Sequence, residues 1–108
     1  MNNTFEKGTV MNLSQQIEYS QGGIISKQVL KNEIGNITLF SFDKDQILSE
    51  HTAPFDAMVQ VIEGKAEILI NGKPNILKTG ESIIMPANIP HALNAIEPFK
   101  MILTMIKG

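Results

Sequence analysis

Cysteine and tryptophan are absent from this chain of 108 residues, and tyrosine occurs once. Without cysteine the protein can form neither disulfide bonds nor thiolate metal sites, a composition that suits a reducing cytoplasm. No apolar stretch approaches the roughly 20 residues that span a bilayer, and the N-terminus lacks the apolar run of a signal peptide. We therefore expect a cytoplasmic protein with no membrane partner.

The chain also lacks a large excess of charge of either sign. Nine basic residues against eleven acidic ones give a net charge of −2, and no segment concentrates lysine or arginine, so nucleic acid is not expected as a partner. Apolar residues are plentiful by comparison, at 43% of the chain, which is enough for a packed core. A single core typically spans ~100–150 residues, so the sequence predicts one domain.

A rhythm of short apolar runs begins after Gly22 and Gly23. The runs are rich in β-branched residues, are separated by turn residues at intervals of about 8–12 positions, and show no sustained helical period, which is typical of a sandwich or small barrel. The sequence predicts an all-β domain with an N-terminal arm at 1–22 and a β-barrel at 23–108. The expected strands are 24–30, 36–42, 47–51, 58–63, 65–70, 82–85, 91–96 and 100–107.

Turns and edges complete this prediction. Asn71 and Gly72 tolerate the positive φ angles of a type I′ turn and predict a hairpin, and 77–80 is expected to form a further turn. In the arm, the spacing of Leu13 and Ile17 predicts a short helical turn. The arm lacks strand partners of its own and is expected to lie across a sheet edge. Sheet edges need cover, and a second copy can supply it, so we expect a homodimer.

Two motifs flank the hairpin, and together they resemble those of the cupin family. That family's patterns are Gly-x5-His-x-His-x3–4-Glu-x6-Gly and Gly-x5-Pro-x-Gly-x2-His. In this sequence the matching positions, in order, are Asp45, His51, Gly64, Gly80, Pro86, Asn88 and His91. Asp45 and Asn88 stand where the family has glycine, and asparagine tolerates the left-handed backbone of such a turn. The resemblance implies an RmlC-like double-stranded β-helix, or jelly-roll barrel.

The resemblance also implies a metal site, of which two ligands remain. His51 falls on the family's first histidine and His91 on its third, whereas Ala53 replaces the second histidine and Ala57 the glutamate. Imidazole and carboxylate ligands suit a divalent Fe, Mn, Ni, Cu or Zn ion. Asp56, at the end of the loop, is the candidate for a further oxygen ligand. The alternative is a metal-free pocket with two hydrogen-bonding imidazoles.

The remaining site candidates would form an apolar ligand pocket beneath the two histidines. Ala53, Ala57 and Val59 are small and leave room for an apolar small molecule. Methionines could supply adaptable walls, although methionine also serves as a filler of irregular cores. The methionines considered for the pocket are Met85, Met101 and Met105.

Three functions remain open at this point, because a fold alone does not specify an activity. The first is a cupin-fold protein that binds a small molecule near His51 and His91. The second is a metal-dependent, oxygenase-like cupin enzyme that uses a divalent ion held by the same two residues. The third is a non-catalytic structural or interaction protein.

Overall fold

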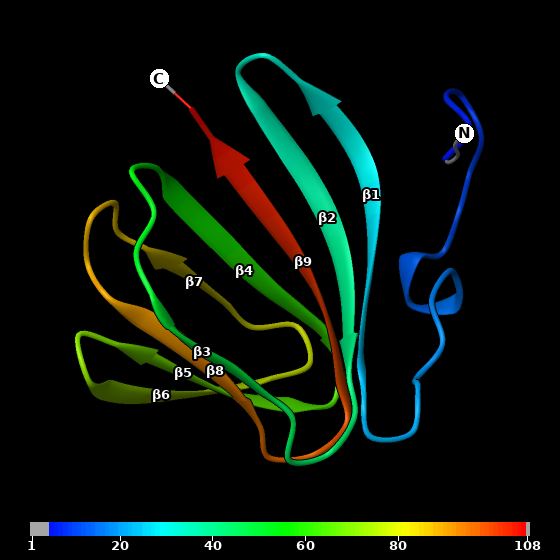
Figure 1. Cartoon of the computed structure of the whole chain (residues 1–108). Helices are drawn as coiled ribbons and strands as arrows, with labels where there is room; N and C mark the ends of the chain where they lie inside the picture. The colour runs from blue at the N-terminus through cyan, green and yellow to red at the C-terminus, as the bar shows by residue number, and fades with distance from the viewer. Residues whose placement is uncertain (1–4, 108) are drawn as a thin grey trace.

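The computed structural model describes residues 5–107, and it is built almost entirely of strands. Two antiparallel sheets face each other, one of five strands in the order β1-β2-β9-β4-β7 and one of four in the order β3-β8-β5-β6 (Figure 1). This is the all-β jelly-roll barrel that the sequence predicted. The strands are β1 (Ile24–Asn32), β2 (Gly35–Phe42), β3 (Ile47–His51), β4 (Asp56–Glu63), β5 (Lys65–Ile70), β6 (Lys73–Lys78), β7 (Ser82–Met85), β8 (His91–Ala95) and β9 (Phe99–Ile106).

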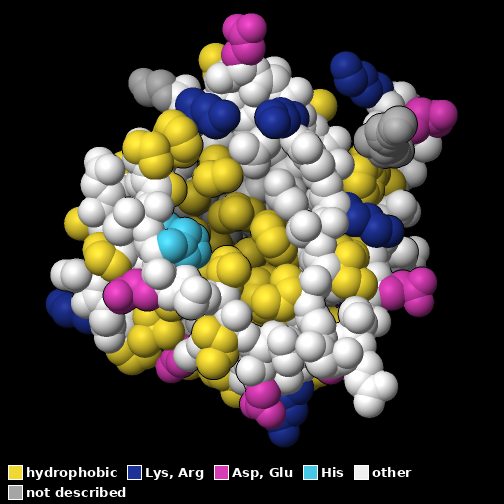
Figure 2. All heavy atoms as spheres, in the orientation of Figure 1, with side chains coloured by type: hydrophobic (Ala, Val, Ile, Leu, Met, Phe, Trp, Pro, Cys, Tyr) yellow, Lys and Arg dark blue, Asp and Glu magenta, His cyan; other side chains and the backbone are white. Residues whose placement is uncertain are grey.

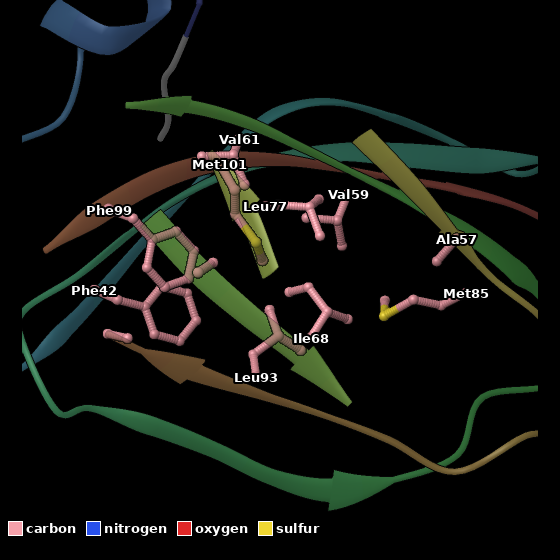
Figure 3. Packing of buried hydrophobic residues seen from close by; sticks show 12 residues of the cluster. Phe42, Ala57, Val59, Val61, Ile68, Leu77, Met85, Leu93, Phe99 and Met101 are labelled. Atoms are coloured by element: carbon pink, nitrogen blue, oxygen red, sulfur yellow. The ribbon is translucent and has the colours of Figure 1, made fainter. Parts of the chain in front are cut away.

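The core lies between the two sheets and is formed by every second residue of each strand. Phe42 of β2 and Phe99 of β9 stack with their ring centroids 4.5 Å apart at the closed end of the barrel (Figure 3). Val59 and Met101 are fully buried in the same cluster. Ala57 and Met85 lie at the other end of the cluster from this stacked pair (Figure 3). We call that end of the barrel the mouth.

The turn predicted at 77–80 is wrong in part, because strand β6 continues to Lys78. Leu77 is a strand residue that pairs with Ala66 and is only 4% exposed, so the turn is confined to the residues after Lys78. Pro74 and the polar residues around it concealed this strand in the sequence. Proline is tolerated there because β6 is an edge strand, where a missing backbone N–H breaks no ladder hydrogen bond on the open side.

Four residues in the turns of the barrel have positive φ angles that bear on the sequence predictions. Asn71 and Gly72 have φ angles of 51° and 79°, which confirms the hairpin between β5 and β6. Asn88 has a φ of 64° and Asp45 a φ of 69°, at the two positions where the cupin pattern has glycine. Both residue types enter the left-handed region at a moderate cost, so the turns survive the loss of glycine.

The N-terminal arm lies against the outer side of the five-stranded sheet, beside β1 (Figure 1). Its one helical turn is the short 3-10 helix Leu13–Gln15. Ile17 is 1% exposed, and the backbone oxygens that surround it accept hydrogen bonds from the sheet: Ser41 Oγ donates to Glu18 at 2.7 Å, and Lys100 Nζ donates to Ser14 at 2.5 Å. No helix in the described residues is long and apolar enough to cross a membrane.

Candidate functional site at the barrel mouth

Two neighbouring strands bring the only two histidines of the chain together. His51 ends β3, His91 begins β8, and the two residues are direct cross-strand partners. Leu48 of β3 pairs with Leu93 and faces the core, so simple alternation would turn His51 outward, three residues later. A bulge between Leu48 and His51 adds one residue to β3 and returns the His51 side chain to the inner face.

The two imidazoles meet edge to face through their Nε2 atoms. The Nε2–Nε2 distance is 3.1 Å, and the ring centroids are 4.3 Å apart with an interplanar angle of 73°. Each Nδ1 contacts a backbone carbonyl, that of Ser49 at 2.7 Å for His51 and that of Ile89 at 3.2 Å for His91. A carbonyl oxygen only accepts hydrogen bonds, so both Nδ1 atoms carry a proton. Each neutral ring therefore turns an Nε2 lone pair towards the other.

The two facing Nε2 lone pairs favour a positive centre that both nitrogens can contact. Two lone pairs at 3.1 Å repel each other, whereas one added proton would make an N–H···N hydrogen bond between the rings. A cation that accepts electron pairs from both nitrogens would relieve the repulsion in the same way. The chemistry of the pair is thus the uptake of one proton or the binding of one electron-pair acceptor.

The two histidines differ in their surroundings. His91 is only 4% exposed, whereas His51 is exposed at the rim. Burial lowers the pKa of His91, the neighbouring His51 lowers it further, and the contact with the Ile89 carbonyl opposes both effects. His91 is accordingly the ring that stays neutral near pH 7, and His51 is the ring that solvent or a ligand reaches first.

The surface beside the histidines is apolar and hollowed. Figure 2 shows hydrophobic side chains exposed in the space between the sheets, with a histidine at its edge. On the five-stranded sheet, Ala57 pairs with Met85 on one side and with Met105 on the other, so a methionine flanks each side of the position where the cupin pattern has glutamate. Around them, partly buried side chains pack against the core, namely Leu48, Ile70, Ile83 and Leu103.

The other predicted pocket residues lie at different depths. Val59 and Met101 are 0% exposed and belong to the packed interior. Ala57 and Met85 are nearer the mouth, at 4% and 3% exposure. Ala53 lies in the loop after β3, and its carbonyl oxygen accepts a hydrogen bond from the Asn88 N–H at 2.7 Å, which ties the loops of the two motifs together.

Among the described residues, no third metal ligand lies beside the histidine pair. Asp56 uses its Oδ1 to accept a hydrogen bond from the Ala87 N–H at 2.9 Å, which fixes the loop before β8. Within residues 5–107, no group of three or more His, Cys, Asp or Glu side chains is placed to hold a metal ion. The pair alone fits part of a site: two nitrogens bound at ~2.0–2.1 Å to one ion, at nearly a right angle, lie about 3 Å apart.

Sequence reasoning missed several contributors to this site. Leu48, Ile70 and Ile83 are partly buried and pack against the core, and their inward direction follows from the alternation of their strands. The carbonyls of Ser49 and Ile89, which set the tautomers of the two rings, had no signal in the sequence because any residue offers a carbonyl oxygen.

Comparisons with known proteins agree with this geometry. A family model described as a cupin domain matches residues 38–106, which include both histidines and all of the barrel's mouth. No curated protein matches the chain significantly.

Several solved structures are similar over most of the chain. A conserved protein of unknown function from Streptococcus pyogenes is 39% identical, with a TM-score of 0.93 over 98% of this chain and 93% of that one. A cupin 2 conserved barrel domain protein from Leptotrichia buccalis is 43% identical, with a TM-score of 0.87, over 90% of this chain but 47% of that one. A cupin superfamily protein from Desulfitobacterium hafniense is 22% identical, with a TM-score of 0.90 over 96% of this chain and 95% of that one. At this level of identity the similarity shows a shared fold.

Proposed function

Because the chain belongs to the cupin family, whose barrels present their sites at the open end, we propose that it binds a small molecule at the mouth beside His51 and His91. The ligand is a small, largely apolar molecule that carries one carboxylic acid. The observation that carries this proposal is the pair of facing Nε2 atoms, 3.1 Å apart, at the edge of an apolar hollow.

The acid group is the part of the ligand that the histidine pair recognises. The ligand binds as the carboxylate that it is at neutral pH. One proton taken from the buffered solvent forms an N–H bond at Nε2 of His51, which donates a hydrogen bond to Nε2 of His91, so the carboxylate lies beside a singly charged imidazole pair. A charge-assisted contact of this kind is about twice as strong as a neutral one.

The apolar body of the ligand is held by the facing sheet. Ala57 leaves space where the family's glutamate would project, and Met85 and Met105 on either side can change rotamer to fit different shapes. A carboxylate metal ligand at position 57 would make this wall polar, and its replacement by alanine favours an apolar ligand instead.

A thermal-shift series with matched ligands tests this proposal. Saturated and aromatic carboxylic acids of increasing size are compared with the primary amides of the same body, which carry no negative charge to balance the protonated histidine pair. We expect the acids to raise the melting temperature of the wild type and the amides to have little effect. His51→Gln should abolish the response to acids, and equal responses to acids and amides would contradict the proposal.

A second candidate function follows from the same nitrogen pair. At 3.1 Å the two Nε2 atoms are spaced as adjacent ligands of one divalent ion, and the family often binds metals. His51 and His91 would hold the ion and orient it towards the hollow, as in an oxygenase-like cupin enzyme. A bound divalent ion supplies Lewis-acid or redox chemistry, and the apolar wall would exclude water from the substrate.

Metal analysis distinguishes this candidate from the first. Untagged protein is expressed in medium supplemented with Fe, Mn, Ni, Cu and Zn and is compared with the His51→Ala and His91→Ala variants. About one ion per chain in the wild type, lost in both variants, would support the metal-dependent enzyme. Sub-stoichiometric metal in all three proteins would leave the metal-free acid-binding site as the function of the pair.

A further inference from the structure

The inner face of the five-stranded sheet changes from apolar to basic towards the β1–β2 hairpin. One row of direct cross-strand partners crosses the sheet at the mouth, and its members are Met85 of β7, Ala57 of β4, Met105 of β9, Asn36 of β2 and Lys31 of β1. Direct partners point to the same face, and the first three pack in or against the core. The apolar wall of the hollow therefore continues into an asparagine and then a lysine.

A second lysine lies above this row, at the rim. Lys107 follows β9, two residues after Met105, so strand alternation gives it the same inward direction. Its backbone N–H donates to the Ile34 carbonyl at 2.6 Å, which extends the pairing of β9 with the hairpin. Its Nζ lies 5.7 Å from the centre of the Phe55 ring, and Phe55 directly precedes β4. These two contacts hold the ammonium group at the rim, beside the apolar wall.

The two lysines give one edge of the hollow a positive charge. The row at the mouth contains no acidic residue, and within residues 5–107 neither Lys31 nor Lys107 is in an ion pair. Figure 2 shows two basic side chains along one edge of the hollow, over the end of β9 and the β1–β2 hairpin of Figure 1, and a histidine along a different edge. Hydrophobic side chains occupy the surface between these edges.

We infer that Lys31 and Lys107 form a binding subsite for an anionic group at the far end of the ligand. The inference rests on the proposed ligand site and extends it. A molecule whose carboxylate lies beside the histidine pair, and whose apolar body lies over Ala57, has its other end near the lysines. The ligand class is then an elongated molecule with an apolar middle and an acidic group, carboxylate or phosphate, at each end.

The lysines strengthen binding because the histidine site already holds the ligand. An exposed ion pair between free partners is weak, since solvent and salt screen it. The second acidic group of a bound ligand is confined close to the lysines, however, so its association costs little further entropy. We expect the second group to raise the affinity about tenfold, and this gain should shrink as the salt concentration is raised.

Isothermal titration calorimetry with two matched ligand series tests the subsite. Straight-chain monocarboxylic acids are compared with the dicarboxylic acids of equal length, over a range of lengths. At the best length the diacid should bind about tenfold more tightly than the monoacid. Lys107→Gln should remove most of this gain without changing the affinity for monoacids, and Lys107→Arg should retain it. The control is Lys44→Gln, which removes the same charge from the exposed turn between β2 and β3 and should keep the gain.

A third series, with a phosphate in place of the second carboxylate, distinguishes the two anions. A phosphate monoester carries a charge of about −1.5 to −2 and can balance both lysines, so a larger gain than that of the diacid would assign phosphate to the subsite. A larger gain for the diacid would assign a carboxylate.

The outcomes separate this inference from the proposed function. If neither second anion tightens binding at any length, or if the gain survives in the double variant Lys31→Gln, Lys107→Gln, the inference is overturned and the acid site at the histidines stands. If the gain is lost in the double variant while His51→Gln binds diacids as well as the wild type does, the lysine subsite stands and the role of the histidines is contradicted. Absence of binding by every series would overturn both.

Discussion

Nε2 of His51 lies 3.1 Å from Nε2 of His91, and the Nδ1 atom of each ring is committed to a backbone carbonyl. Because each Nδ1 keeps the single proton of its neutral ring for a backbone carbonyl, neither Nε2 carries a proton. This relationship determines the chemistry of the mouth, because the two facing lone pairs can share one bound cation, or one proton when a ligand carboxylate lies beside the rings to balance its charge. A lone surface histidine would gain much less from either.

Acidification should destabilise the protein through His91. Burial lowers the pKa of His91 in the fold, whereas in the unfolded chain a histidine titrates near pH ~6.5. Below about pH 6.5 the unfolded state therefore binds more protons than the folded state, and the free energy of unfolding falls by up to about 1.4 kcal/mol per pH unit until the lowered pKa is reached. Urea titrations between pH 7.5 and 5.5 measure this slope.

The control for this pH dependence is a comparison of the two histidines. His91→Gln should remove most of the slope, because the titrating group is gone. His51→Gln should retain most of it, since burial, the largest cause of the lowered pKa, is unchanged in that variant. Equal slopes in the wild type and in His91→Gln would show that His91 is not the residue responsible.

Restoring the family's missing ligands should create a strong metal site. In the double variant Ala53→His, Ala57→Glu, a second histidine and a carboxylate join His51 and His91, and catalytic sites generally use about three protein ligands. We expect the affinity for Ni²⁺ or Zn²⁺, measured by isothermal titration calorimetry, to rise at least 100-fold over the wild type. Ala57→Gln is the matched control, and it should give little gain because a neutral amide is a weak ligand.

Gly64 should tolerate no side chain. It has a φ of 87°, and a Cβ there would overlap the Pro98 carbonyl oxygen and the Phe99 backbone. Gly64→Ala should therefore lower the free energy of unfolding by about 3 kcal/mol or more. Gly72 has a similar φ of 79° with open space around it, so Gly72→Ala should cost only ~1 kcal/mol. Chemical denaturation of the two variants compares them, and equal losses would be contrary to this account.

The fold could be predicted from the sequence because its elements repeat simple patterns. Alternation along β2 places Phe42 and Leu39 on opposite faces, as the structure has them, and Asn71-Gly72 marked a hairpin turn. The strand β6 was partly missed, because Pro74 and its polar neighbours do not alternate clearly. The outward Leu39 is buried by the arm, a contact between distant segments that no local pattern indicates.

The sequence predicted that His51 and His91 lie close together, but it did not predict the geometry of the pair. The motif resemblance identified His51 and His91 as neighbours, whereas their facing Nε2 atoms depend on a bulge in β3 that alternation cannot predict. The depth of each inward-facing residue below the mouth could not be predicted from the sequence either. Val59 and Met101 point inward as alternation requires, yet they lie below the mouth in the closed core, because the period of a strand specifies a face and not a height.

The central claim is that the histidine pair takes up one proton when it binds an apolar carboxylate. Isothermal titration calorimetry at pH 7.5, in two buffers with different ionisation enthalpies, measures the number of protons taken up with the best acid of the thermal-shift series. We predict an uptake close to one proton per ligand in the wild type and loss of binding in His51→Gln. Binding without proton uptake, or equal binding by His51→Gln, would contradict the account.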